Sequence, residues 1–118
     1  MHRDLDMQIA VDVKGRELLG TEGLKAHAHG RVCRVLDGFP GAVDRASVTI
    51  RDRGDHVYQC RLQLWLDGEV VMVVHVEDVD PVTGVNRAAD RVRRNLARNR
   101  RMRRGDQRPF RFKWVGPR

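Results

Sequence analysis

The sequence predicts an α+β fold of two layers, in which a four-stranded sheet carries two helices on one face in the order β-α-β-β-β-α. Four stretches alternate between apolar and polar residues, as half-buried strands do, and two others space their apolar residues as amphipathic helices do. The pair Asp67-Gly68 is a strong signal for a tight hairpin turn. These patterns predict one domain over residues 1–104, followed by a basic and aromatic tail over residues 105–118.

The first two elements are a strand and a helix. Residues 7–13 alternate, with Ile9 and Val11 on one face, which predicts a strand. Thr21 can begin a helix that runs to about Leu36, before a segment rich in glycine and proline ends it. The apolar side of this helix comprises Leu24, Ala28, Val32, Val35 and Leu36.

Three strands follow, over residues 43–51, 57–66 and 69–77. The first two are joined by a hairpin loop at residues 52–55. The second strand alternates most regularly, which places Cys60 in the core. The third strand is the most hydrophobic, and its second face is less polar than a solvated face should be. We therefore expect this strand to be central in the sheet or to be covered on that face.

A second helix is predicted over residues 81–103, because Asp80 before Pro81 suits the cap and first positions of a helix. A rotation of about 100° per residue separates its apolar side from a row of arginines on the opposite side. The apolar side comprises Val85, Ala89, Val92 and Leu96. The arginine row comprises Arg87, Arg91, Arg94, Arg98 and Arg101. Beyond Leu96 the apolar stripe ends, so we expect the last turns of the helix to project past the body of the domain.

Charge is distributed unevenly along the chain. Residues 86–118 contain 13 basic and two acidic residues and carry a formal charge of +11, whereas the rest of the chain carries −4. Arginine dominates this segment, and its planar guanidinium binds phosphate oxygens in pairs and stacks on bases. The alternative, a solvated helix face, usually mixes both signs. The segment therefore predicts a polyanionic partner, with nucleic acid as the first candidate.

Catalytic and metal-binding patterns are weak. His27 and His29 point to different sides of the predicted helix and cannot share one metal ion. Glu77, Asp78 and Asp80 lie between a strand and a helix, where we expect capping rather than acid-base catalysis. We therefore predict that the protein is not an enzyme and requires no cofactor, metal or small-molecule substrate.

Cysteine usage and hydropathy favour a cytoplasmic protein. Cys33 and Cys60 have no metal-type spacing, no signal peptide is expected, and no apolar run approaches the roughly 20 residues that cross a bilayer. Trp65 is expected on the outward face of the sheet, where it is either a stacking platform, a subunit contact, or covered by another segment. The aromatic tail could add an edge strand, bind along RNA, or remain disordered.

Several short motifs follow one another in a specific order and spacing over residues 7–104. They are Met7-Gln8-Ile9 leading to Gly15-Arg16, Gly23-Leu24-Lys25-Ala26-His27 leading to Arg31-Val32 and Val35-Leu36, Val48-Thr49-Ile50, and Ala88-Ala89-Asp90-Arg91-Val92-Arg93-Arg94-Asn95-Leu96 followed by basic residues. In this combination the chain resembles the ribosome hibernation-promoting factor family, also called ribosome-associated inhibitors or ribosomal subunit interface proteins. The order of elements is also similar to that of double-stranded-RNA-binding domains.

The resemblance implies a cytoplasmic protein that binds the small ribosomal subunit in the channel for messenger and transfer RNA and inhibits translation in slow growth, stationary phase or stress. It assigns contacts with ribosomal RNA phosphates to arginines of the second helix, supported by two arginines of the first. These residues are Arg87, Arg91, Arg93, Arg94, Arg98, Arg100, Arg101, Arg31 and Arg34. The chain departs from the family in having arginine where lysine is frequent, and in lacking the second domain by which long members pair ribosomes. We expect a short-type factor that is monomeric when free; whether it promotes or blocks ribosome pairing stays open.

Two other functions also stay open. The protein could bind duplex or structured RNA on its own, without a role in hibernation. Its basic helix could also dock on an acidic protein or a membrane surface, although we expect no membrane partner. Co-sedimentation with small subunits distinguishes the first alternative, and survival of the complex after nuclease digestion distinguishes the second.

Overall fold

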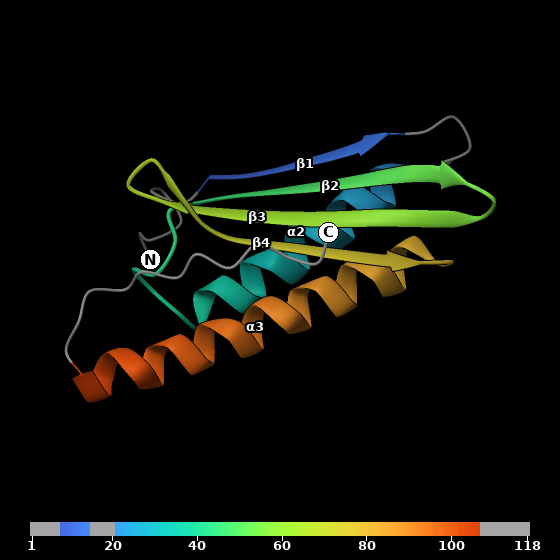
Figure 1. Ribbon diagram of the computed structural model, residues 1–118. Helices are drawn as coiled ribbons and strands as arrows, with labels where there is room; N and C mark the ends of the chain where they lie inside the picture. Colours follow the sequence, from blue (N-terminus) through green and yellow to red (C-terminus); the bar gives the residue numbers. More distant parts are fainter. Residues whose placement is uncertain (1–7, 15–20, 107–118) are drawn as a thin grey trace.

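The computed structural model describes residues 8–14 and 21–106, except for the side chains of Lys14, Thr21 and residues 100–106. Its elements are β1 (Gln8–Lys14), α2 (Thr21–Asp37), β2 (Arg45–Gly54), β3 (Val57–Leu66), β4 (Glu69–Asp78) and α3 (Pro81–Asp106). This order confirms the predicted α+β arrangement, and both helices lie side by side on one face of the sheet (Figure 1). Met7 and the tail beyond residue 106 lie outside the described residues. Neither described helix is long and apolar enough to cross a membrane.

The strands lie in the sheet in the order β1-β2-β3-β4. β1 runs parallel to β2 because α2 carries the chain back between them, whereas hairpins make the other two pairs antiparallel. Asp67 and Gly68 have φ values of 56° and 83°, as the predicted tight turn requires. The other hairpin turns at Asp55 and His56, so β2 continues to Gly54 through a segment predicted as loop.

Apolar side chains fill the layer between the sheet and the helices. The register pairs Val48 with Leu62 and Leu62 with Val74, so alternate residues of β2, β3 and β4 face the helices. The predicted apolar side of α3, comprising Val85, Ala89, Val92 and Leu96, is at most 2% exposed. The predicted apolar side of α2 is buried as well. Burial of a valine or leucine side chain contributes roughly 1.5–3 kcal/mol, so this stripe anchors α3 on the sheet.

β4 is an edge strand, which makes a central position, one of the two alternatives expected for it, wrong. On its outward face Val73 is nevertheless buried, with 7% of its surface exposed. Val71 lies beside an irregularity in the pairing with β3 and belongs to the core. The edge position matters for the site, because it leaves one row of β4 backbone groups without a neighbouring strand among the described residues.

Asp80 fixes the start of α3. Its Oδ2 accepts hydrogen bonds from the backbone N–H of Thr83 at 3.1 Å and from Thr83 Oγ1 at 2.7 Å, and Pro81 occupies the first helical position. The predicted cap is therefore confirmed. The helix continues to Asp106, beyond the predicted end at residue 103, and its last turns extend past the sheet (Figure 1).

Candidate nucleic-acid interface

The arginines of α3 do not all lie opposite its buried side. Measured from Val92 by a rotation of about 100° per residue, Arg94 lies roughly 160° away, whereas Arg91 and Arg93 lie only about 100° away on either side. Arg91 is accordingly half-buried, and Arg94 is exposed. The arginines of α3 thus divide into residues beside β4, residues that face solvent, and Arg93 on the side of α2.

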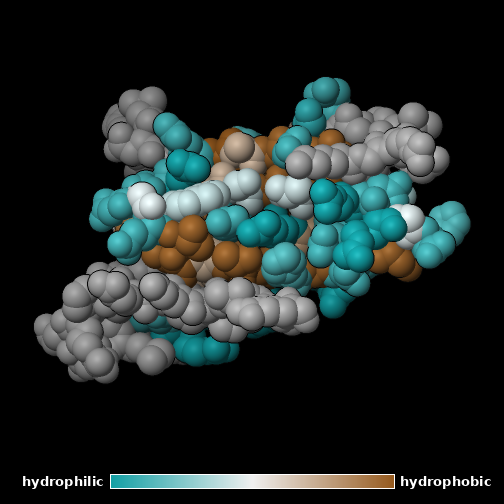
Figure 2. Space-filling model, turned by 45° about the horizontal axis from the view of Figure 1, so that its top comes forward, coloured by the Kyte–Doolittle hydropathy of each residue, from teal (hydrophilic) through white to brown (hydrophobic). Residues whose placement is uncertain are grey.

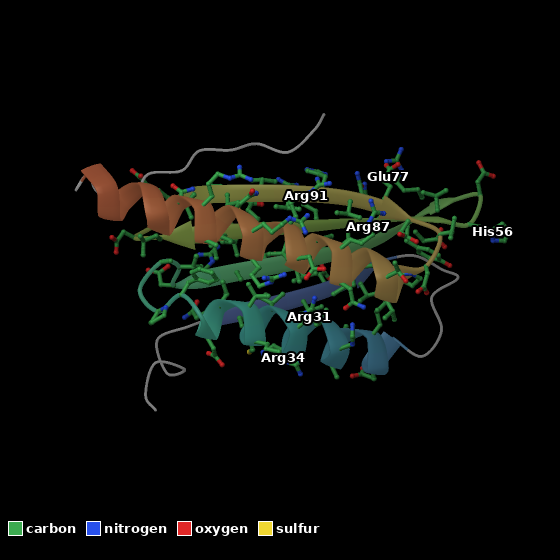
Figure 3. The ribbon with its side chains drawn as sticks, turned by 90° about the horizontal axis from the view of Figure 1, so that it is seen from below. Arg31, Arg34, His56, Glu77, Arg87 and Arg91 are labelled. Atoms are coloured by element: carbon green, nitrogen blue, oxygen red, sulfur yellow. The ribbon has the colours of Figure 1, made fainter. Side chains whose placement is uncertain are left out.

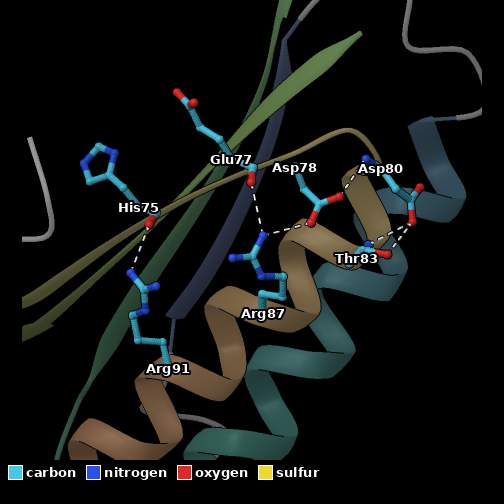
Figure 4. A network of polar contacts seen from close by, with 7 residues as sticks. All are labelled: His75, Glu77, Asp78, Asp80, Thr83, Arg87 and Arg91. Carbon is cyan, nitrogen blue, oxygen red and sulfur yellow. Dashed lines mark hydrogen bonds and ion pairs between the residues drawn. The ribbon is translucent and has the colours of Figure 1, made fainter.

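Arg87 and Arg91 bind the edge of β4 (Figure 4). Arg91 Nη1 donates to the carbonyl oxygen of His75 at 3.3 Å, and Arg87 Nη1 donates to that of Glu77 at 3.2 Å. The helix runs back along the strand, so residues four apart on α3, separated by roughly 6 Å, match carbonyls two apart on β4, separated by roughly 7 Å. Two of the arginines predicted to bind RNA therefore also stabilise the sheet edge.

Acidic residues at the end of β4 hold arginines rather than cap the helix. Asp78 Oδ2 accepts a hydrogen bond from Arg87 at 2.9 Å, and Asp78 Oδ1 accepts one from the backbone N–H of Asp80 at 3.0 Å. The Asp80 N–H, followed by Arg87, lowers the pKa of Asp78 below its ordinary value. Glu77 pairs with Arg53 at 3.3 Å on the exposed surface. Of the three acids predicted to cap α3, only Asp80 accepts a hydrogen bond from its first turn.

Arg94 and Arg98 form the open part of the arginine row. Both are exposed, and neither has a hydrogen bond or ion pair within the part of the chain that the structure describes. Arg93 is also exposed, but its Nη2 lies 3.7 Å from Asp90 Oδ1. The side chains of Arg100 and Arg101 lie outside the described residues. The full donor sets of Arg94 and Arg98 are therefore available to an anion such as phosphate.

A polar cluster joins α2 to α3 beside this row (Figure 3). Asn86 Oδ1 accepts hydrogen bonds from His27 Nε2 at 2.8 Å and from Arg31 Nε at 3.1 Å. Arg31 Nη2 also lies 3.2 Å from Asp90 Oδ1 and 3.4 Å from the backbone oxygen of Asn86. Because the Arg31 side chain is only 22% exposed, it mainly fixes one helix against the other, whereas Arg34 on the same helix is exposed. Of the two α2 arginines in the predicted site, Arg34 is the one open to a partner.

The sequence did not indicate Asn86 and Asp90 as partners of α2. The only sequence signal for this contact is their spacing of four residues, which places both on one side of α3. That spacing does not reveal which residue of α2 faces them, because the contact joins positions more than fifty residues apart in the chain.

No protein-family model and no curated protein matches this sequence. Two solved structures have the same fold. The N-terminal domain of protein Y from Thermus thermophilus aligns with a TM-score of 0.63 and 24% identity, over 78% of this chain and 98% of that one. A ribosomal subunit interface protein from Coxiella burnetii aligns with a TM-score of 0.66 and 12% identity, over 80% of this chain and 99% of that one. At these identities the similarity establishes a shared fold, which spans nearly the whole of both relatives.

Proposed function

We propose that this protein is a ribosome-binding inhibitor of translation, of the hibernation-promoting type, that acts in the cytoplasm on the small ribosomal subunit. One observation carries the proposal: a fold shared with a ribosomal subunit interface protein presents, on α3, exposed arginines that have no partner within the described residues. The motifs that resemble the hibernation-factor family support it. The action is steric, because the bound protein occupies the channel for messenger and transfer RNA and no covalent bond is made or broken.

Arg94 and Arg98 are the centre of the proposed contact with ribosomal RNA phosphates. Arg93 and Arg34 flank them, and Arg100 and Arg101 continue along the helix. Arg87 and Arg91 extend the row with the donors that β4 does not use, and Arg31 holds the two helices in place. Release of counterions drives such binding, and neutralisation of about six phosphates gives a log-log salt slope of about −4 to −5.

Co-sedimentation with purified small subunits, at salt concentrations from about 50 to about 200 mM, tests the proposal. The variant Arg94→Ala/Arg98→Ala should bind more weakly and reduce the magnitude of the salt slope by about 1.5, because two phosphate contacts are lost. The control Lys25→Ala/Arg53→Ala removes the same charge away from the proposed contact and should keep the slope. If both variants sediment with the subunits like the unmodified protein, the proposed contact is wrong.

A stand-alone structured-RNA binder is the alternative function that this experiment must separate. Duplex RNA added at the same nucleotide concentration as the subunits provides the comparison. A hibernation factor stays with the subunits and inhibits a reconstituted translation reaction. A general RNA binder is displaced by the duplex, and its effect on translation disappears when the duplex is present.

A further inference from the structure

The side of the sheet opposite the helices is hydrophilic along its two central strands, as Figure 2 shows. On this side lie the residues of β2 and β3 that alternate with core residues. They are Arg45, Ser47, Thr49, Arg51, Gln59, Arg61, Gln63 and Trp65. Three of these positions are arginines and none is acidic, whereas the adjacent strands carry Asp12, opposite Thr49, and Glu77, opposite Gln59, on the same side. We call this set the central-strand face.

Trp65 and Arg45 form a stacked pair on the central-strand face. They are partners across β2 and β3, and Arg45 Cζ lies 4.3 Å from the centroid of the Trp65 ring. The ring thus holds the guanidinium by a cation-π contact. Arg45 is exposed, so the guanidinium side away from the ring is accessible to a further planar group. Nucleic-acid bases stack on arginine planes and on aromatic rings when they are unpaired.

The other two arginines of this face, Arg51 and Arg61, can bind phosphates of the nucleic-acid strand whose base stacks on Arg45. Arg61 lies four residues before Trp65 on β3, a distance of roughly 13 Å along the strand. No carboxylate lies within ion-pair distance of Arg45, Arg51 or Arg61 in the described parts of the chain. Among the described residues, no ion pair therefore occupies the phosphate-binding donors of these arginines.

Neighbouring groups keep this positive charge effective. Glu77, on the adjacent edge strand, is already paired with Arg53 at 3.3 Å. His75 lies opposite Arg61 in the register of β3 and β4, and its pKa is lowered first by burial and then by the charge of Arg61, against a smaller opposite effect of Glu77. The charge of Arg61 is thus effective at the surface of the sheet.

We propose that the central-strand face is a second nucleic-acid site, which binds a single-stranded segment by stacking a base on the Arg45–Trp65 pair and holding phosphates with Arg51 and Arg61. The site lies on the opposite layer of the domain from the arginine row of α3, and it does not depend on ribosome binding. Its sequence preference is weak, because stacking and phosphate contacts read no base edge. Duplexes are excluded, because their bases are not available for stacking.

Fluorescence of Trp65 tests this site directly. The chain has two tryptophans, so Trp114→Phe leaves Trp65 as the only tryptophan, which is excited selectively over Tyr58. The probes are an oligouridylate and an oligothymidylate of about 12 nucleotides, and an RNA duplex of the same length, at constant salt. Either single strand should quench Trp65, and a preference for the oligouridylate identifies RNA as the ligand. The duplex should leave the emission unchanged.

Four variants in this background separate stacking from charge. Arg45→Ala/Arg61→Ala should weaken binding of the single strands about tenfold. The control Lys25→Ala removes one positive charge from α2 and should weaken binding much less than Arg61→Ala alone. Arg45→Lys, which keeps the charge and loses the planar group, should reduce affinity several-fold without changing the salt slope. Thermal unfolding confirms that each variant is folded.

Three results would overturn the proposal. Saturating single strands could leave Trp65 emission unchanged, which is also the outcome if this face docks a protein instead. The control Lys25→Ala could weaken binding as much as Arg61→Ala alone. The duplex could quench Trp65 as strongly as the single strands. None of these results bears on sedimentation with small subunits, so this proposal and the proposed function can fail separately.

Discussion

Replacement of Arg91 by alanine should destabilise the protein, whereas replacement of Arg94 by alanine should not. Arg91 is half-buried and donates to the His75 carbonyl at 3.3 Å. A well-formed hydrogen bond to a charged group contributes about 1.5–3 kcal/mol; because this one is long and partly exposed, we expect a loss of about 1 kcal/mol. Arg94 is exposed and has no partner among the described residues, so its loss should change the free energy of unfolding by less than about 0.5 kcal/mol.

Two measurements on the same pair of variants give opposite rankings. In urea unfolding followed by circular dichroism, Arg91→Ala should lower the free energy of unfolding and reduce the melting temperature by about 4 °C. In binding to small subunits, Arg94→Ala should reduce the magnitude of the salt slope by about 0.7–0.9, the contribution of one phosphate. Arg91→Ala should reduce it less, because the β4 carbonyl already uses part of that guanidinium.

The comparison is sharp because both variants remove the same side chain from one helix, three positions apart. Equal destabilisation by the two variants would refute the assignment of Arg91 to the sheet edge. An equal or larger loss of salt slope for Arg91→Ala would show that Arg91 leaves β4 when RNA binds. Arg91→Lys adds a control, since it keeps the charge but shortens the reach to the carbonyl.

Three further predictions concern single side chains. His56, at φ 60° in the turn between β2 and β3, should be replaceable by glycine with a gain of about 1 kcal/mol in urea unfolding, because the left-handed region costs a side chain that much; an unchanged or lower stability contradicts this. A thiol reagent at about pH 8 should label Cys33 in the native protein and leave Cys60 unlabelled until unfolding, because burial raises the pKa of Cys60 to about 12. Rapid labelling of both thiols would show that the core opens readily. Burial, and then Arg61, lowers the pKa of His75 in the native protein. As the pH falls, His75 is therefore protonated in the unfolded chain before it is protonated in the native protein. The contribution of neutral His75 to stability is complete above about pH 6.5 and is lost as the pH falls through the lowered pKa. Stability measured against pH should therefore be flatter in His75→Gln, and an identical profile would exclude this role.

Local patterns in the sequence predicted those features that depend on nearby residues. The alternation over residues 57–66 gave β3 with the bounds observed, and Asp67-Gly68 gave the turn after it. The sequence also predicted the cap at Asp80 and the buried stripe of α3, and both are confirmed. In each case one residue type has a strong preference for one local geometry, so a few neighbouring positions suffice.

Features that depend on distant partners were not predictable in the same way. The hydrophobicity of β4 predicted a strand that is either central or covered on its second face, and it could not distinguish the two; β4 lies at the edge of the sheet. Once β4 is known to lie at the edge, its carbonyls become acceptors, and Arg87 and Arg91 lie within reach of them. Helical phase placed these arginines on the surface but could not distinguish solvent from the edge of a sheet.

The positions of the acidic residues show how the basic charge is distributed along α3. Asp78 binds Arg87, and Asp90 lies beside both Arg31 and Arg93, so charge is partly neutralised in the first half of the helix. From Arg94 onward the sequence of α3 contains no acid before Asp106. Like charges one turn apart cost a few tenths of a kcal/mol each, but the negative end of the helix dipole offsets part of that cost. Positive charge therefore increases toward the end of α3 that extends past the sheet, so the attraction of this helix for a polyanion should be strongest there.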